Sequence, residues 1–209
     1  MYVPTTLNQP AGALAPVGIV STAEIPGLAK TAISVSSTRL NVLAGHAATV
    51  TGTLRPEVRG RVVMLQALGS HGWSTVARAR TRARGRFQLH FTTRRTGSQR
   101  VRVRFAGDAS ELGSHRRLGW LNTFRLAGAS WYGGGGSMAC GGSLTSATLG
   151  VANKTLPCGT LVTLRYGGRS VRVPVVDRGP YVAGREFDLT EATKQALGFG
   201  DTGDVWSTR

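Results

Sequence analysis

Histidine, acidic residues and cysteine are scarce in this chain of 209 residues, and each shortage narrows what the protein can do. No histidine follows His115, so the later part of the chain lacks a histidine base for a serine nucleophile and a histidine to complete a metal site. No stretch reaches eighteen consecutive apolar residues, which argues against a membrane-spanning helix. Hydrophobic residues still make up 41% of the chain, too many for wholesale disorder. We therefore expect a folded protein with no metal and no other cofactor.

The positive charge is unevenly distributed. The formal net charge is +16, from 26 lysines and arginines against 10 aspartates and glutamates. Residues 1–125 hold 18 basic and 4 acidic residues, a net +14, whereas residues 126–209 hold 8 and 6, a net +2. The first part therefore carries most of the electric field, and anionic polymers are its natural partners.

The two cysteines, Cys140 and Cys158, both lie in the second half of the chain. In a cytosolic protein two such residues would more often be free thiols, whereas in an exported protein they would form a disulfide. A bridge over this spacing would stabilise the fold by roughly 3 kcal/mol. We expect the disulfide on the condition that the protein is exported.

The first 32 residues lack the basic start and compact apolar run of a signal peptide. Proline, alanine and glycine recur there instead, so residues 1–32 are expected to form a flexible leader. Whether a signal has been trimmed from this sequence or the gene start lies elsewhere stays open.

Alternation of apolar and polar residues dominates 33–117 and is clearest at 86–91 (RFQLHF) and 100–105 (RVRVRF). Further strands are expected near 47–54, 61–67 and 74–81. Because side chains alternate across a strand, the apolar residues should face a core. The opposite, wet face should be shared by Arg86, Arg100, Arg102 and Arg104. Five or more short strands in about 85 residues indicate a small antiparallel β-sandwich.

Residues 118–127 are expected to form a linker into a second domain, 128–209. Four glycines at 133–136 could suggest a phosphate loop, but no Gly-Lys-Ser/Thr follows them, which excludes that motif. Candidate strands at 161–166 and 169–176 are joined by a Gly-Gly pair, a link typical of a hairpin. Thr190 would cap a short helix over 191–197.

Four motifs occur in order in the second domain, at 129–133 (ASWYG), 153–160 (NKTLPCGT), 176–181 (VDRGPY) and 187–190 (FDLT). In these residues and their order, about residues 128–206 resemble RlpA-like domains. The resemblance implies a six-stranded double-psi β-barrel, which is also similar to that of expansins. Characterised members of the family include lytic transglycosylases, which cut the glycan strands of peptidoglycan.

The first domain in turn resembles the bacterial Ig-like modules of secreted actinobacterial proteins. The runs that carry this resemblance are 52–54 (GTL), 60–66 (GRVVMLQ), 72–73 (GW), 85–87 (GRF) and 105–108 (FAGD). Expansins also carry an Ig-like module, but after the barrel, whereas here it comes first.

The second domain departs from the RlpA-like pattern at two places. Family enzymes usually have a glutamate where 138–142 (MACGG) has none, and a histidine usually precedes Lys-Thr-Leu-Pro where this chain has Asn153. Asp177 is retained. The cysteine pair looks like that of a Gram-positive branch closer to expansins.

Asp177 is the residue to which the resemblance assigns the chemistry. One carboxylic acid can protonate the glycosidic oxygen, and the resulting carboxylate can take the proton of the sugar's own C6 hydroxyl, closing a 1,6-anhydro ring without water. A groove of low polarity would favour the acid form, whereas pairing with Arg178 would favour the carboxylate. The simpler interpretation is that Asp177 caps its own turn by accepting N–H bonds, and the two roles can coexist.

Asp188 is the second candidate catalytic residue, matching the second aspartate of the expansin-like groove, although it could instead hold the start of the helix at Thr190. Six further residues are expected to contact substrate: Trp131, Tyr132, Asn153, Arg178, Tyr181 and Glu186. The two aromatic residues at 131–132 would stack on sugars unless they pack in the core. Asn153 could orient a hydroxyl but cannot shuttle protons, and Glu186 could be merely solvated.

The arginines of the first domain have three interpretations: a solvated face, a site for anionic wall polymers such as teichoic-type phosphates, or a nucleic-acid site. Aromatic residues do not interleave with the arginines of 78–86, which argues against nucleic acid.

These patterns predict an all-β protein, with an Ig-like β-sandwich at 33–117 and a six-stranded double-psi β-barrel with one short helix at 128–209. The predicted function is lytic transglycosylation of peptidoglycan by a secreted protein at the wall of a Gram-positive-type, actinobacterial cell. The alternatives are a non-catalytic, expansin-like protein that binds and loosens the wall, and a secreted inhibitor or effector built on the barrel.

Overall fold

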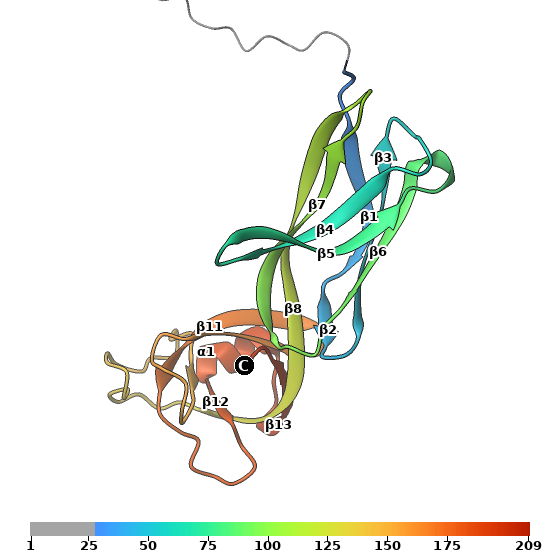
Figure 1. Cartoon of the computed structure of the whole chain (residues 1–209). Coiled ribbons are helices and arrows are strands. Elements are labelled where there is room, and N and C mark those ends of the chain that lie inside the picture. The colour runs from blue at the N-terminus through green and yellow to red at the C-terminus, as the bar shows by residue number, and fades with distance from the viewer. Residues whose placement is uncertain (1–27) are drawn as a thin grey trace, which may run out of the picture.

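A computed structural model describes residues 28–209, which form an all-β protein of two bodies that share one strand (Figure 1). This strand, β8 (Leu112–Tyr132), is 21 residues long and runs from the sandwich into the barrel. It pairs with β7 as far as Thr123 and with β13 from Arg125 onward. The segment expected as a linker, 118–127, is therefore continuous strand, because almost every residue in it has a pairing partner in one body or the other.

The sandwich consists of two sheets. One sheet contains β1 (Ala32–Arg39), β3 (Ala47–Arg55) and β6 (Arg86–Thr92), the last preceded by the 3-10 turn η1 (Ala83–Gly85). The other contains β4 (Val62–Gly69), β5 (Gly72–Arg80), β7 (Gly97–Gly107) and the first part of β8, which β2 (Asn41–Leu43) joins in parallel. The expected alternation is confirmed, since Leu89 and Val103 are fully buried between the sheets. This architecture is compatible with the expected Ig-like module.

The four arginines expected on one wet face lie on two faces. Arg86 belongs to β6, whereas Arg100, Arg102 and Arg104 belong to β7 in the opposite sheet. The outer faces of two packed sheets point in opposite directions. Alternation identified the solvent-facing residues, but it carries no information about which sheet each strand joins.

Six strands form the barrel: the second part of β8, β9 (Val151–Ala152), β10 (Leu161–Tyr166), β11 (Arg169–Asp177), β12 (Phe187–Thr190) and β13 (Thr202–Ser207). Their order is β12-β9-β11-β10-β13-β8, and pairing of β12 with β8 closes the ring. The β9–β11 and β8–β12 pairings are parallel, and the others are antiparallel. Leu164, Val173 and Leu189 are fully buried inside.

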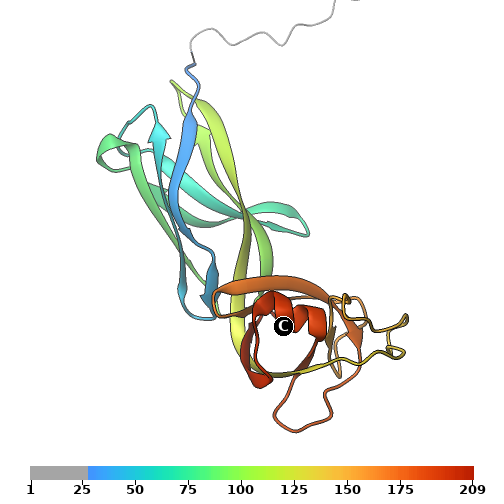
Figure 2. The same cartoon turned by 180° about the vertical axis from the view of Figure 1, so that it is seen from behind.

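Three local expectations for the barrel are confirmed. Gly167 and Gly168, both at positive φ, join β10 to β11 in a two-residue hairpin. The expected helix α1 (Glu191–Leu197) follows Thr190 and packs against β11 and β12 (Figure 2). The Thr190 hydroxyl donates to the carbonyl of Gly150 and makes no capping hydrogen bond to the helix, so the expected cap is wrong in that detail. A disulfide joins Cys140 to Cys158 and thereby ties the loop before β9 to the loop after it.

Residues just before β1 are held against β8. Ala29 forms a bridge with Glu111, and the Thr31 hydroxyl donates to the carbonyl of Leu112 at 2.7 Å. The rest of the expected leader, 1–27, lies outside the described residues. Between residues 28 and 209, no helix has the length and apolar character needed to cross a membrane.

Candidate functional site

Four neighbouring barrel strands bring two aspartates and a serine into one row. Ala152 on β9 is the register partner of both Asp177 on β11 and Asp188 on β12. Asp188 is also the partner of Ser130 on β8. Partnered residues in a sheet point to the same face, so the Asp188 carboxyl group and the Ser130 hydroxyl lie together. On β11 a register shift just before Asp177 interrupts the alternation, and Asp177 is placed near this site because its charge and that of Asp188 both act on Tyr132. With one strand between them, the Cα atoms of the two aspartates lie roughly 10 Å apart.

Asp177 is half-buried at the end of β11. Its Oδ1 accepts hydrogen bonds from the backbone N–H groups of Arg178 and Ala139, both at 2.8 Å. Oδ2 accepts no hydrogen bond from the described residues. Ala139 is held in place because the neighbouring Cys140 is in the disulfide and donates its N–H to the carbonyl of Val176. Asp177 therefore caps its turn through one oxygen and leaves the other available to a ligand.

Tyr132 lies on β8 two residues after Ser130, and its hydroxyl is buried without a hydrogen-bond partner in the described part of the chain. Burial raises the pKa of Tyr132 well above its usual value, and the charges of Asp177 and Asp188 raise it further. The phenol is thus close to both carboxylates and interacts most strongly with Asp177, as a donor to that carboxylate as well as through its charge, although the hydroxyl lacks full hydrogen-bond geometry. It stays protonated, and its hydroxyl is sealed from solvent beside the two carboxylates.

Asp188 is oriented by a residue that the sequence analysis did not single out. The Ser130 hydroxyl donates to Asp188 Oδ1 at 2.6 Å. The signal in the sequence was the two-residue spacing of Ser130 and Tyr132, which puts both on one face of β8. Among residues 28–209 there is no cluster of three or more histidine, cysteine, aspartate or glutamate side chains that could hold a metal ion.

Arg178 and Asn153 hold the loop that follows β9. The Arg178 guanidinium donates to the carbonyls of Asn153 and Leu156, at 3.0 and 2.8 Å, and it forms no ion pair with Asp177. Asn153 is 8% exposed; its Oδ1 accepts from the N–H groups of Thr155 and Leu156, and its Nδ2 donates to the carbonyl of Glu186. Both side chains are therefore engaged within the barrel.

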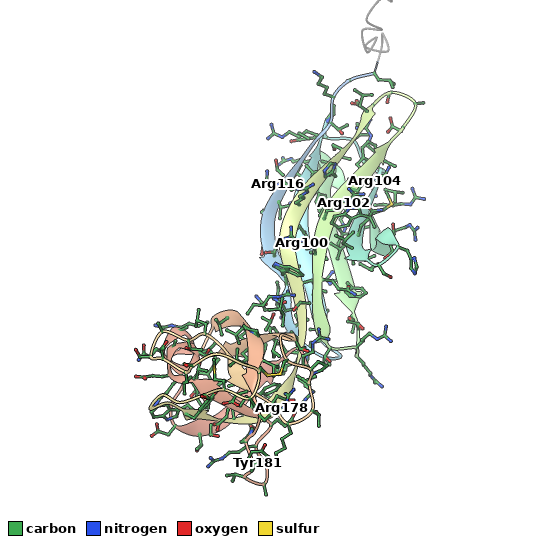
Figure 3. The ribbon with its side chains drawn as sticks, turned by 90° about the vertical axis from the view of Figure 1, so that its left-hand side faces the viewer. Arg100, Arg102, Arg104, Arg116, Arg178 and Tyr181 are labelled. Atoms are coloured by element: carbon green, nitrogen blue, oxygen red, sulfur yellow. A yellow bond between two sulfur atoms is a disulfide. The ribbon has the colours of Figure 1, made fainter. Side chains whose placement is uncertain are left out.

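The remaining expected contacts are exposed or bound to other side chains. Trp131 precedes Tyr132 on the strand and so points to the other side, where its Nε1 donates to Asp201 at 2.9 Å and Lys194 lies 3.7 Å from its ring centre. Tyr181 is 81% exposed on the loop between β11 and β12, which projects from the barrel (Figure 3). Glu186 forms an ion pair with Arg125, with one N···O distance of 2.8 Å.

The closed barrel and its sequence together define a class of protein. Residues 126–205 match the family model described as "Lytic transglycolase", and this part of the chain is a double-psi β-barrel. The barrel is of the RlpA-like kind. It is similar to the "Probable endolytic peptidoglycan transglycosylase RlpA" of Aquifex aeolicus, with 45% identity over 75 residues, 34% of this chain and 33% of the relative. The "Endolytic peptidoglycan transglycosylase RlpA" of Pseudomonas aeruginosa (strain UCBPP-PA14) is 38% identical over 86 residues, 38% of this chain and 25% of that protein.

The similarity to these relatives is confined to the barrel. The aligned regions span 33% and 25% of their lengths. Among solved structures, the "Streptomyces papain inhibitor (SPI)" aligns with 40% of this chain and 92% of its own, at 22% identity and a TM-score of 0.33.

Proposed function

We propose that the barrel cleaves the glycan strands of peptidoglycan as a lytic transglycosylase, with Asp177 as both acid and base. The observation that carries the proposal is the Asp177 carboxyl group, whose Oδ1 is fixed by two N–H groups and whose Oδ2 has no protein donor. It lies in a barrel similar to proteins named as endolytic peptidoglycan transglycosylases.

The proposed reaction needs one carboxyl group and no water. The Asp177 acid donates its proton to the glycosidic oxygen as the bond from that oxygen to C1 breaks and positive charge develops at C1. The carboxylate then takes the proton of the C6 hydroxyl while O6 bonds to C1. This closes the 1,6-anhydro ring and restores the acid. The N–H groups of Ala139 and Arg178 hold Oδ1 throughout.

Tyr132 and Asp188 would bind and orient the sugar in this scheme. The half-buried Tyr132 borders the two carboxylates, and Asp188, fixed by Ser130, adds a second carboxyl group near Asp177. Groups held in place before the substrate arrives need no reorganisation during the reaction, which is what makes them effective.

A second function, non-catalytic binding and loosening of the wall, is favoured by the departures from the family pattern. Asn153 stands where a histidine usually lies, and its side chain binds backbone groups of its own loop and the carbonyl of Glu186. Segment 138–142 has no glutamate. This alternative predicts that removing the Asp177 acid changes neither wall binding nor loosening.

The test is digestion of purified peptidoglycan followed by mass analysis of the soluble products. The wild-type protein should release fragments with anhydro ends, and Asp177→Asn should lower the rate by about 10²–10⁴-fold while the folded variant still pulls down with walls. Asp204→Asn, on an exposed aspartate of β13, is the matched control and should cleave normally. A folded wild-type protein that binds walls and releases no anhydro ends would establish the binding function instead.

We also propose that the protein acts outside the cytoplasm, at a cell wall of the Gram-positive type. A disulfide such as Cys140–Cys158 persists in that oxidising setting. There the basic sandwich would meet anionic wall polymers in addition to glycan, and we propose such a polymer as a second partner.

A further inference from the structure

The outer face of the β5–β4–β7–β8 sheet carries rows of arginines. Register pairing sets Arg78, Met64, Arg104 and His115 side by side across the four strands. The next row along contains Arg102 and Arg117, and Arg100 follows beside Trp120. We call this set the arginine face: Arg78, Arg80, Arg100, Arg102, Arg104 and Arg117. Figure 3 shows Arg100, Arg102 and Arg104 succeeding one another along the sandwich.

No carboxylate neutralises the arginine face. The acidic residues of the described sandwich lie in its loops, where Arg55 pairs with Glu57 and Arg61 pairs with Asp108 and Glu111. Within residues 28–209, no arginine of the face has an acidic group within 4.0 Å. The face therefore holds its positive charge without an internal counter-charge.

The like charges of the face are close enough to act on one another. Burial lowers the pKa of Arg102, and the charges of Arg104 and Arg117 lower it further. Arg102 is held in this position by the hydrogen bond from its Nε to Gln66 at 2.9 Å. An anion bound across these guanidinium groups would relieve the repulsion.

Two tryptophans support the arginines. The Arg102 guanidinium lies 4.3 Å from the ring centre of Trp73, and Trp120 carries Arg100 at 5.2 Å and Arg172 at 4.2 Å. A guanidinium stacked on a ring keeps its N–H edge free for a partner and is held in a fixed plane. Because Arg172 belongs to β11, the line of cations continues from the sandwich onto the barrel.

The partner that fits this face is a linear polymer of phosphates. Alternate residues of a strand lie about 6.7 Å apart, so three arginines on β7 present charge over about 13 Å. Guanidinium groups bind phosphate oxygens in pairs. Nucleic acid would use aromatic rings to stack its bases, but Trp73 and Trp120 already carry guanidinium groups. A phosphate polymer without aromatic groups has no need of those rings.

We infer that the arginine face binds a wall polymer of phosphodiester-linked polyol units, laid along β7 toward the barrel. The inference rests on the proposed wall function for the place where the polymer is met. The face itself is built from residues remote in sequence from Asp177, so the two claims can fail separately.

Binding of lipid-free poly(glycerol phosphate) to the whole chain, measured by calorimetry over a series of salt concentrations, tests the inference. The logarithm of the association constant should fall linearly with the logarithm of the salt concentration. The slope should be about −0.7 per contacted phosphate, the value for single-stranded nucleic acids. Arg100→Glu with Arg104→Glu should weaken binding by at least about tenfold. Arg39→Glu with Arg86→Glu, on the opposite sheet, makes the same charge change and should weaken binding by less than about threefold.

Three results would overturn the inference. They are equal losses in both double variants, tighter binding of single-stranded DNA of equal charge, and no binding by the wild-type chain. Arg100→Gln with Arg104→Gln removes the two charges without reversing them and so controls for misfolding of the glutamate variant. It should give an intermediate loss of polymer affinity with unchanged circular dichroism. Glycan cleavage is measured separately. A variant that loses polymer binding but still cleaves glycan supports an independent face, and so does a protein that binds the polymer but cannot cleave glycan.

Discussion

The sandwich and the barrel are both built from strands around an aliphatic core, but they pair their strands differently. In the charged sheet of the sandwich, β4 pairs with β5 and β7 with β8, all antiparallel, which repeats one surface pattern along the sheet. In the barrel, parallel pairing of β9 with β11 and of β8 with β12 joins segments distant in the chain. Two antiparallel hairpins, joined by the pairing of β4 with β7, thus yield a broad face of like charges. Parallel pairing in the barrel gathers single residues into a site.

The strand β8 connects these two regions, yet their cores are separate. Leu65 lies in the sandwich core and Leu164 in the barrel core, both fully buried. We expect Leu65→Ala and Leu164→Ala each to lower the free energy of unfolding of its own body by about 2–5 kcal/mol. Hydrogen exchange read strand by strand during denaturation checks this. Equal loss of protection in both bodies from either substitution would show that β8 makes them one cooperative unit.

Removing the disulfide should lower the stability of the barrel but not that of the sandwich. Only the barrel contains cysteine, so Cys140→Ser with Cys158→Ser should cost the barrel about 3 kcal/mol and leave the sandwich unchanged. The loop that presents the Ala139 N–H to Asp177 would also loosen, so cleavage should slow. Denaturation with and without reductant gives the same comparison on the wild-type chain, and an equal loss in the sandwich would contradict it.

The smallest effect on stability is expected from Tyr132→Phe. This substitution should change the free energy of unfolding only at alkaline pH. Because the folded barrel raises the pKa of this phenol, the folded state keeps a proton that the unfolded chain loses. The associated stability is complete below about pH 10, the ordinary pKa of tyrosine, and is lost as pH rises from there toward the folded value. Wild type and variant should therefore have equal pH dependence near neutrality and diverge above about pH 10. Parallel curves throughout would contradict the burial of the hydroxyl.

Much of this fold could be predicted because alternation, turn glycines and capping residues act locally. The strands at 86–91 and 100–105, the Gly-Gly hairpin and the helix after Thr190 all follow from such signals. The segment 118–127 was expected as a linker but is continuous strand. Its pairing first with the sandwich and then with the barrel depends on residues far away in the sequence, which local patterns do not show. The four arginines were assigned to one face because alternation shows only which residues of a strand face solvent. Which sheet each strand joins depends on long-range pairing.

For the site, Asp177 and Asp188 could be identified from motifs, but their proximity required the register through Ala152. Tyr132 was found while Ser130, which donates to Asp188, was missed, although both follow from alternation along β8. The same rule separates Trp131 from Tyr132, because consecutive residues of a strand cannot face one groove. Asn153 and Arg178 hold backbone groups of a loop whose shape no local pattern specifies.

The central claim is that Asp177 cleaves glycan without water, and digestion in water labelled with heavy oxygen tests it most directly. If the C6 hydroxyl attacks C1, the new anhydro ends carry no label, and Asp177→Asn yields almost none of them. Labelled reducing ends would show that water attacks instead, and unchanged cleavage by Asp177→Asn would show that this carboxyl group is not the acid. Either result would contradict the account.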